Sequence, residues 1–326
     1  MRRFGWLVLA GAAIACGSGS GGGSSGPATI DGVQVMAGFD PGPAPAAGTG
    51  FQAVLPIVNN IAAGGSYEYC TWTNVILPED VWIKSAEGIQ TETGHHIVIF
   101  YTTNTQPAGT SRICNDSDMA TFRFAMPASG GGEGATTTTL PGDLATKLPK
   151  GAQIVLNHHY LNASTHDVVQ AQSAINVHYA TPGAKITPSN SMVVLDDTMQ
   201  VPVGKSSLKI SCTLDNDYAT WAQFPHAHQY ATHFTVDHTP AGGATNRMVD
   251  VDWTPDYAFH PPEKSYDPSS PYVFHKGDQL NIQCDYNNPT GKPLDFGMEM
   301  CIFFTDTVDP NMVGNMACDK GTWGPY

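Results

Sequence analysis

The chain has few charged residues and very few basic ones. Only 13% of its 326 residues are Asp, Glu, Lys or Arg, and 29 acidic against 15 basic residues give a formal net charge of −14. Nucleic-acid binding needs a basic surface that neutralises phosphates, so this composition argues against a nucleic-acid partner. A small or apolar partner fits the composition better.

The sequence also lacks any segment with a sustained apolar repeat of 3.6 residues, so long amphipathic helices are not expected. Short runs rich in β-branched and aromatic residues, separated by Gly- and Pro-rich turns, predict strands instead. These runs are 75–77, 96–102, 152–161, 173–180, 208–214, 233–236, 247–253, 279–286 and 298–305. We predict an all-β fold of two tandem antiparallel β-sandwiches of jelly-roll-like character. The Gly- and Thr-rich stretch 129–139 is predicted to be a loop.

The length favours two domains, because one hydrophobic core rarely supports more than about 250 to 300 residues. A polar, proline-bearing stretch at 181–191 is the expected boundary. We therefore predict an N-terminal domain at 31–184 and a C-terminal domain at 185–326.

The first residues have the pattern of an export signal. Arg2 and Arg3 precede an apolar run at 6–14 that is too short to span a bilayer as a mature helix, and small residues lead to Cys16. We predict a signal peptide at 1–16, lipid attachment at Cys16 and a flexible Gly/Ser linker at 17–30. The protein is then a bacterial envelope lipoprotein, on the outer membrane or cell surface, whose only membrane contact is the lipid. The alternative is plain secretion after cleavage nearby.

Without Cys16, an even number of cysteines remains, which in an exported protein indicates three disulfides. The six are Cys70, Cys114, Cys212, Cys284, Cys301 and Cys318. Pairing within domains joins Cys70 to Cys114 and leaves three choices for the other four.

Histidine clusters are the main functional signal. Two clusters lie in the first half of the chain, and a His-x-His lies in the second half, followed by a methionine-rich strand. The candidate ligands are His95, His96, His159, His226, His228 and Met300. Imidazole and thioether donors, with no cysteine free to compete, suit copper. The distribution predicts two metal sites on two domains.

The spacing within the clusters differs. His226 and His228 share one face of a strand, so both can bind one ion. His95 and His96 point to opposite faces unless they lie at a strand end or bulge, and Gly94 offers the backbone freedom for that. The pair at 158–159 is expected to supply one ligand and one bystander. The alternatives are half-exposed surface histidines and a methionine that only fills the core.

These motifs resemble the copper type II, ascorbate-dependent monooxygenases, the family of peptidylglycine α-hydroxylating monooxygenase and dopamine β-monooxygenase. The resemblance covers about residues 67–318 in the family's order. It implies two copper ions per chain, with ascorbate or another one-electron reductant as co-substrate. The resemblance assigns an electron-supplying copper to the first three histidines and an oxygen-activating copper to the other three ligands. It also implies the disulfides Cys70 with Cys114, Cys212 with Cys318, and Cys284 with Cys301.

Departures from the family pattern concern the substrate. Phe224, Ile302 and Phe304 stand where polar groups would hold a peptide carboxylate, so an apolar or aromatic substrate fits better. The expected function is a copper-dependent monooxygenase that hydroxylates a C–H bond of a small molecule with O₂. One alternative is a non-catalytic copper-binding lipoprotein of the same fold. The other is a zinc hydrolase, which the absence of an H-E-x-x-H motif and the methionine ligand disfavour.

Overall fold

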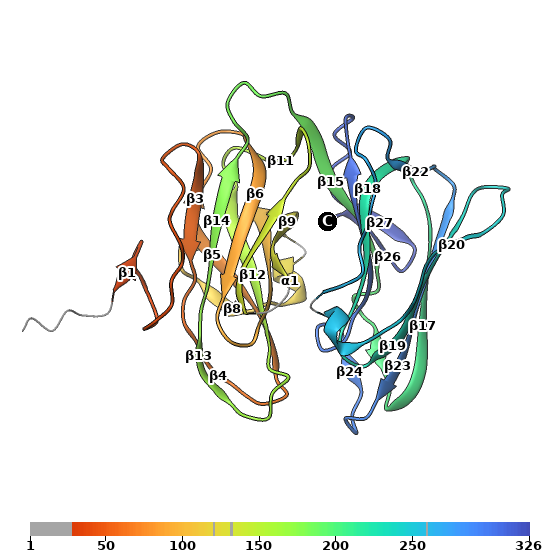
Figure 1. Cartoon of the computed structure of the whole chain (residues 1–326), viewed down its shortest axis with the longest axis horizontal. Coiled ribbons are helices and arrows are strands. Elements are labelled where there is room, and N and C mark those ends of the chain that lie inside the picture. The colour runs from red at the N-terminus through yellow and green to blue at the C-terminus, as the bar shows by residue number, and fades with distance from the viewer. Residues whose placement is uncertain (1–27, 120, 131–132, 259) are drawn as a thin grey trace, which may run out of the picture.

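The computed structural model describes residues 28–326 except 120, 131, 132 and 259, and shows two lobes of β-sheet side by side (Figure 1). The predicted signal peptide, Cys16 and most of the linker lie outside the described residues. Within the described part, helical structure is limited to α1 (Asp116–Met119) and the 3₁₀ turn η1 (Pro255–Ala258). No helix in that part is long and apolar enough to cross a membrane. The predicted all-β fold is confirmed.

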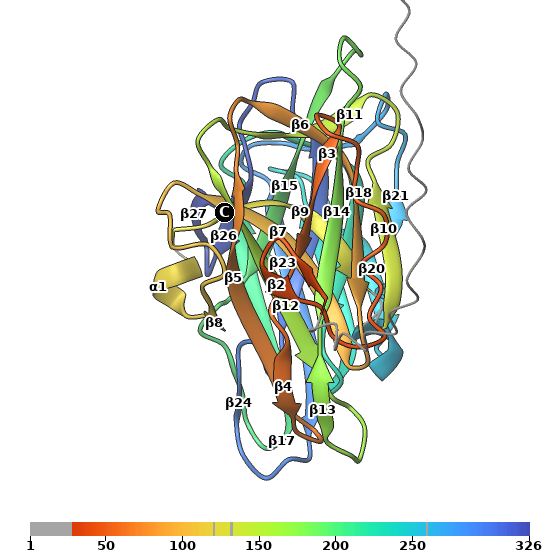
Figure 2. The ribbon, with the colours of Figure 1, turned by 90° about the vertical axis from the view of Figure 1, so that its left-hand side faces the viewer.

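The first lobe contains the strands β1 to β14. Their bounds are β1 (Thr29–Ile30), β2 (Val33–Gln34), β3 (Gly50–Val54), β4 (Val58–Ile61), β5 (Ser66–Ile76), β6 (Val81–Gln90), β7 (Gly94–Thr102), β8 (Ser111–Ile113), β9 (Arg123–Gly130), β10 (Gly134–Thr139), β11 (Leu144–Leu148), β12 (Gln153–Leu161), β13 (Val168–Ala171) and β14 (Ser173–Tyr179). A five-stranded sheet, β8-β5-β12-β7-β9, packs against the sheet that contains β11, β6, β14 and β3. Figure 2 shows the outer side of this second sheet, with β6, β14 and β3 adjacent.

The second lobe contains β15 to β27. Their bounds are β15 (Thr187–Leu195), β16 (Gln200–Val201), β17 (Gly204–Thr213), β18 (Tyr218–Ala227), β19 (Ala231–Thr239), β20 (Asn246–Asp252), β21 (Lys264–Ser265), β22 (Tyr272–Phe274), β23 (Gln279–Asn288), β24 (Leu294–Asp295), β25 (Cys301–Val308), β26 (Met316–Asp319) and β27 (Thr322–Pro325). The sheet β17-β23-β19-β20 covers one side of the core, and β18, β25 and β15 cover the other. β15 also pairs with β11, so one sheet continues from the first lobe into the second.

Successive residues of a strand point to opposite faces of the sheet. In the strands at the lobe junction, side chains therefore point alternately into the core of their own lobe and into the space between the lobes. In β7, Ile97 and Ile99 are buried in the first core, whereas Val98 and Phe100 line a pocket between the lobes. In β25, Cys301 and Phe303 face the second core, whereas Ile302, Phe304 and Asp306 line the same pocket. The junction is therefore built from the outer faces of two sheets.

The prediction of a loop at 129–139 was wrong. β9 extends to Gly130, and β10 pairs with β6 from Gly134↔Gln90 to Thr139↔Ser85. β10 lies at the edge of its sheet, and its residues alternate between half-buried and exposed. Threonine is β-branched and favours strands, so a polar composition is compatible with an edge strand that keeps one face in water.

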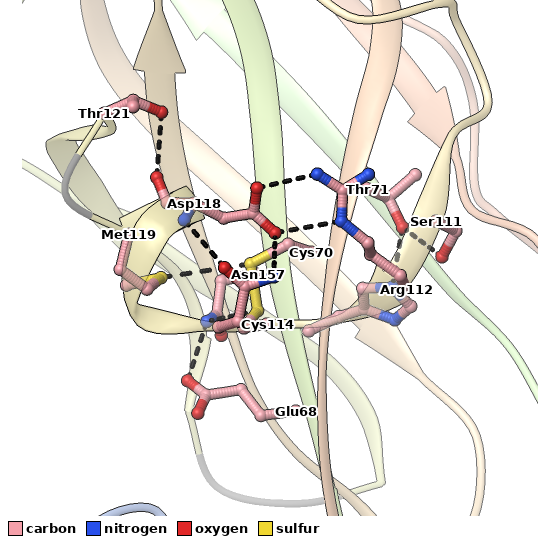
Figure 3. Close-up of a disulfide and its surroundings, with 12 residues drawn as sticks. Glu68, Cys70, Thr71, Ser111, Arg112, Cys114, Asp118, Met119, Thr121 and Asn157 are labelled. Atoms are coloured by element: carbon pink, nitrogen blue, oxygen red, sulfur yellow. Dashed lines mark hydrogen bonds and ion pairs between the residues drawn. A yellow bond between two sulfur atoms is a disulfide. The ribbon is translucent and has the colours of Figure 1, made fainter.

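All three disulfides predicted from the resemblance are confirmed: Cys70–Cys114, Cys212–Cys318 and Cys284–Cys301. Three disulfides indicate an oxidising compartment and therefore an exported protein. Figure 3 shows the Cys70–Cys114 bridge, with Asn157 of β12 donating to Glu68 at 2.7 Å. This bridge supports β12 two residues before His159.

Removal of the Cys284–Cys301 bridge by a double Cys→Ala substitution should destabilise the protein by ~3 kcal/mol, because it releases a short closed loop in the unfolded chain. Urea unfolding of both proteins under oxidising conditions measures the difference. An unchanged free energy of unfolding would show that the bridge does not constrain the chain.

Candidate metal centre

The five candidate histidines form one cluster between the lobes. Ring-centroid distances are 4.7 Å for His95–His96, 4.8 Å for His95–His159, 4.9 Å for His96–His159, 5.2 Å for His95–His228 and 5.2 Å for His226–His228. Across the lobes His95 also lies 6.0 Å from His226. The histidines predicted for two sites thus lie side by side in one cluster, because the lobes meet at the faces that carry them; the number of metal ions per chain stays a prediction.

A bulge in β7 lets neighbouring histidines point into the cluster together. His159 pairs with His96, but Tyr160 pairs with Gly94, so His95 is an extra residue in the ladder. Gly94 is required for space: a Cβ there would lie 2.3 Å from Cβ of Gln90. The bulge was predicted, but the reason for the glycine is close approach of neighbouring atoms.

Gly94→Ala should therefore displace the bulge and destabilise the protein by at least about 1 kcal/mol, because overpacking forces the backbone to move. Gly324→Ala is the matched control, since a Cβ there meets nothing within 4 Å. Thermal unfolding of both variants measures the effect. Equal stability of the two variants would contradict the steric account.

β12 separates its two histidines by alternation. His159 joins the cluster, whereas His158 lies on the other face, where its Nε2 is 2.9 Å from Oγ1 of Thr71 and its Nδ1 is 3.4 Å from the Tyr160 hydroxyl. This placement agrees with the expectation of one candidate ligand and one bystander.

Hydrogen bonds orient the rings. His95 Nε2 donates to the carbonyl of Ala258 at 2.8 Å, and His228 Nδ1 donates to the carbonyl of Met298 at 3.3 Å. In neutral imidazole the second nitrogen then carries a lone pair. His95 Nδ1 lies 3.0 Å from His159 Nδ1, and among the described residues the buried Nε2 of His228 has no hydrogen-bond partner. The first pair is therefore within hydrogen-bond distance, and its spacing is also close to the about 3.3 Å that separates two nitrogens of a tetrahedral metal site.

All five rings are kept neutral. Burial lowers the pKa of His95 to about 4. Burial first, and neighbouring histidines second, lower the pKa of the other four well below the ordinary value. Metal ligation requires the neutral ring, so at neutral pH no proton has to be displaced from these side chains.

Met300 lies next to this cluster rather than at its centre. It lines the pocket together with His95, His96 and His226, and packs against Val193 and Ile302. Cys301, the next residue, points into the opposite core and forms its disulfide there, as alternation predicts. A ligand role for Met300 stays a prediction.

A pocket of about 500 Å³ opens beside the histidines. Its walls are largely aromatic: Phe100, Phe122 and Phe124 come from the first lobe, and the rings of Phe224 and Phe304 stack at 5.2 Å in the second. The apolar character inferred from Phe224, Ile302 and Phe304 therefore matches the observed lining.

Asp306 is a carboxyl group in this largely apolar wall. Burial, more than the nearby Glu263, raises its pKa to about 6, although Ser191 donates a hydrogen bond to it at 2.7 Å. A raised folded-state pKa means that the ionised form destabilises the fold above pH 6, and that this cost disappears as the pH falls toward the ordinary value.

Asp306→Asn should therefore stabilise the protein at pH 8 by up to about 3 kcal/mol and give no gain at pH 4. Chemical unfolding of both proteins at the two pH values measures the gap. A gap of equal size at pH 4 and pH 8 would refute the assignment to ionisation.

Several residues that support the cluster were missed by the sequence reasoning. Ser66 lies 2.7 Å from His159 Nε2, Ala258 accepts from His95, and Glu299 accepts from the backbone of His228. Ser66 and Ala258 lack any sequence signal. Glu299 had one, as a lone charge between two methionines in an apolar stretch.

Comparisons with known proteins give no assignment to a family. No family model matches the chain, and no curated protein matches it. The major capsid protein P2 of bacteriophage PM2 is similar at a TM-score of 0.30 and 9% identity, over 80% of this chain and 99% of that one. A protein from the triple jelly-roll fold and turret assembly of an archaeal virus scores 0.20 at 8% identity, over 80% and 60%. The PBSX exported protein XepA scores 0.20 at 8% identity, over 78% and 86%.

These comparisons correct the functional prediction. The prediction of a copper-dependent monooxygenase is corrected: no family model or curated protein matches, the structures named above are a bacteriophage capsid protein, a protein of an archaeal virus and an exported protein, and no enzymatic activity is assigned to this chain. The likeness is too remote to carry a capsid role over to this chain.

Proposed function

We propose that the protein is an exported, non-catalytic metal-binding protein that holds copper at the histidine cluster. His95, His96 and His159 are the primary ligands, since one nitrogen from each can lie within 4.8 Å of the others. His226 and His228 contribute to the same centre from the second lobe. The sequence predicts two copper ions per chain. If two ions bind, both are held by this one cluster of histidines.

The observation that carries this proposal is the arrangement of ring nitrogens. His95 and His228 each donate a proton outward to a backbone carbonyl, at Ala258 and Met298. The other nitrogen of each ring therefore carries a lone pair: that of His95 lies 3.0 Å from His159 Nδ1, and that of His228 is buried with no hydrogen-bond partner among the described residues. Metal-ligating histidines usually show this arrangement, because an outer acceptor fixes the tautomer and leaves the inner nitrogen for the ion.

The donor set favours copper. Imidazole suits both copper and zinc, but the described part of the cluster contains no carboxylate or thiolate ligand and lies beside the thioether of Met300. Thioether donors select Cu(I), and copper exceeds zinc in affinity for a given site. Ascorbate enters the proposal only as a reductant of bound copper.

The decisive experiment is a copper titration against a chelator, with His95→Ala and His228→Ala as variants from the two lobes. Because both rings belong to one centre, each variant should weaken the binding of all the copper by at least about tenfold. His260→Ala is the control, since its side chain is 62% exposed and lies outside the cluster. Two independent sites would leave half of the copper bound as tightly in His228→Ala as in the unmodified protein. Tighter binding of zinc than of copper would contradict the metal assignment.

The proposal also covers a small-molecule ligand, O₂ and the lipid at Cys16. The apolar pocket would accept a small aromatic or aliphatic molecule next to the metal, and O₂ has no role without catalysis. Lipid attachment at Cys16 would hold the folded lobes to the cell envelope through the Gly/Ser linker. Mass spectrometry of the mature N-terminus tests the lipid directly.

A further inference from the structure

Where two strands of the second lobe stop pairing, a buried carboxylate accepts the hydrogen bonds of the backbone. β18 and β25 are paired as far as Ala227↔Cys301, where their ladder ends. Glu299 fills the gap with 0% of its surface exposed. Its Oε1 accepts the backbone N–H of His228 at 2.5 Å and of Met300 at 3.1 Å, and its Oε2 accepts that of Tyr230 at 3.0 Å.

The same contacts fix the His228 ring. His228 Nδ1 donates to the carbonyl of Met298, and the carbonyl of His228 accepts from the indole of Trp253 at 3.0 Å. The backbone, the carbonyl and the ring of His228 are thus each held by a separate hydrogen bond. With these contacts in place, the unpartnered Nε2 has one direction available, toward the other histidines.

A carboxyl group is an expensive way to fill a buried gap. An ionised carboxylate in an apolar interior is strongly disfavoured unless hydrogen bonds compensate it, and no Lys or Arg among the described residues forms an ion pair with Glu299. Three backbone donors supply compensation here. An apolar side chain of the same size would leave those three buried N–H groups without an acceptor.

We propose that Glu299 is a positioning residue of the metal centre, whose carboxylate holds His228 and Met300 toward the other histidines before any metal arrives. This inference rests on the proposed function. Preorganised ligands bind more tightly because the ordering is complete before binding, and outer groups that orient ligands contribute about 10- to 100-fold in metal affinity.

The test compares Glu299→Gln with a second buried carboxylate that also binds backbone. Asp278 is 3% exposed and accepts from the backbone of Ala241 at 2.8 Å, from the backbone of His275 at 2.9 Å and from the His238 ring. Asp278 binds His238 near the end of β19, whereas His228 of the cluster lies before the start of that strand. Asp278→Asn therefore imitates the loss of a structural carboxylate without touching a ligand.

Glu299→Gln places an amide NH₂ against the N–H of Tyr230, because glutamine has only one acceptor oxygen. We expect both variants to lower the melting temperature of the metal-free protein. Only Glu299→Gln should raise the copper dissociation constant, by about 10- to 100-fold. Copper affinity equal to that of the unmodified protein in Glu299→Gln, or an equal loss in Asp278→Asn, overturns the inference while leaving the proposed function intact. Failure of the unmodified protein to bind copper overturns both.

A measurement on the unmodified protein covers the case in which Glu299→Gln does not fold. In the metal-free protein, the amides of His228, Tyr230 and Met300 should exchange with deuterium as slowly as the ladder amides of β18, although they lie outside that ladder. Fast exchange at these three positions before copper is added would show that the site is not preorganised, and would overturn the inference.

Discussion

Five neutral imidazoles gathered in one cluster between the lobes are the constraint on which the rest of the structure depends. His95 and His228 each donate a proton outward to a carbonyl, so each ring keeps a lone pair on its other nitrogen. That nitrogen of His95 lies 3.0 Å from His159 Nδ1, within hydrogen-bond distance, whereas that of His228 has no partner among the described residues. A cation at the centre would be bound by these lone pairs. The burial that keeps the rings neutral also keeps them available as ligands.

The β-sandwich architecture delivers these rings to one place. Each lobe uses one face of a sheet for its core and the opposite face for the junction, so His226 and Phe304 come from strands whose alternate residues are core, and Met300 directly precedes β25. The Cys284–Cys301 disulfide lies behind the Met300 strand, and β15 continues a sheet from one lobe to the other. At the start of β7, a bulge turns His95 toward the cluster. After the end of β18, the carboxyl group of Glu299 holds the backbone of His228.

Much of the fold was accessible from sequence because alternation and turn residues are local signals. Strands at 96–102 and 279–286, the bulge after Gly94 and the side on which Cys301 points follow from a period of two residues. The pairing of Cys212 with Cys318 came from the family resemblance alone. The strand at Gly134–Thr139 was missed because edge pairing depends on a distant partner, β6. Whether the two sets of histidines form one cluster depends on how the lobes pack, which is not a local signal. The monooxygenase prediction failed because the spacing of a motif indicates which ligands can bind a metal but says little about whether the protein catalyses a reaction.

The most direct test of the central claim is anomalous diffraction at the copper edge from crystals of the copper-loaded protein. The account predicts copper between the lobes, within bonding distance of nitrogens from both His95 and His228. Copper bound only to histidines of one lobe, or only at the exposed acidic group Asp196, Asp197 and Asp319, would contradict it.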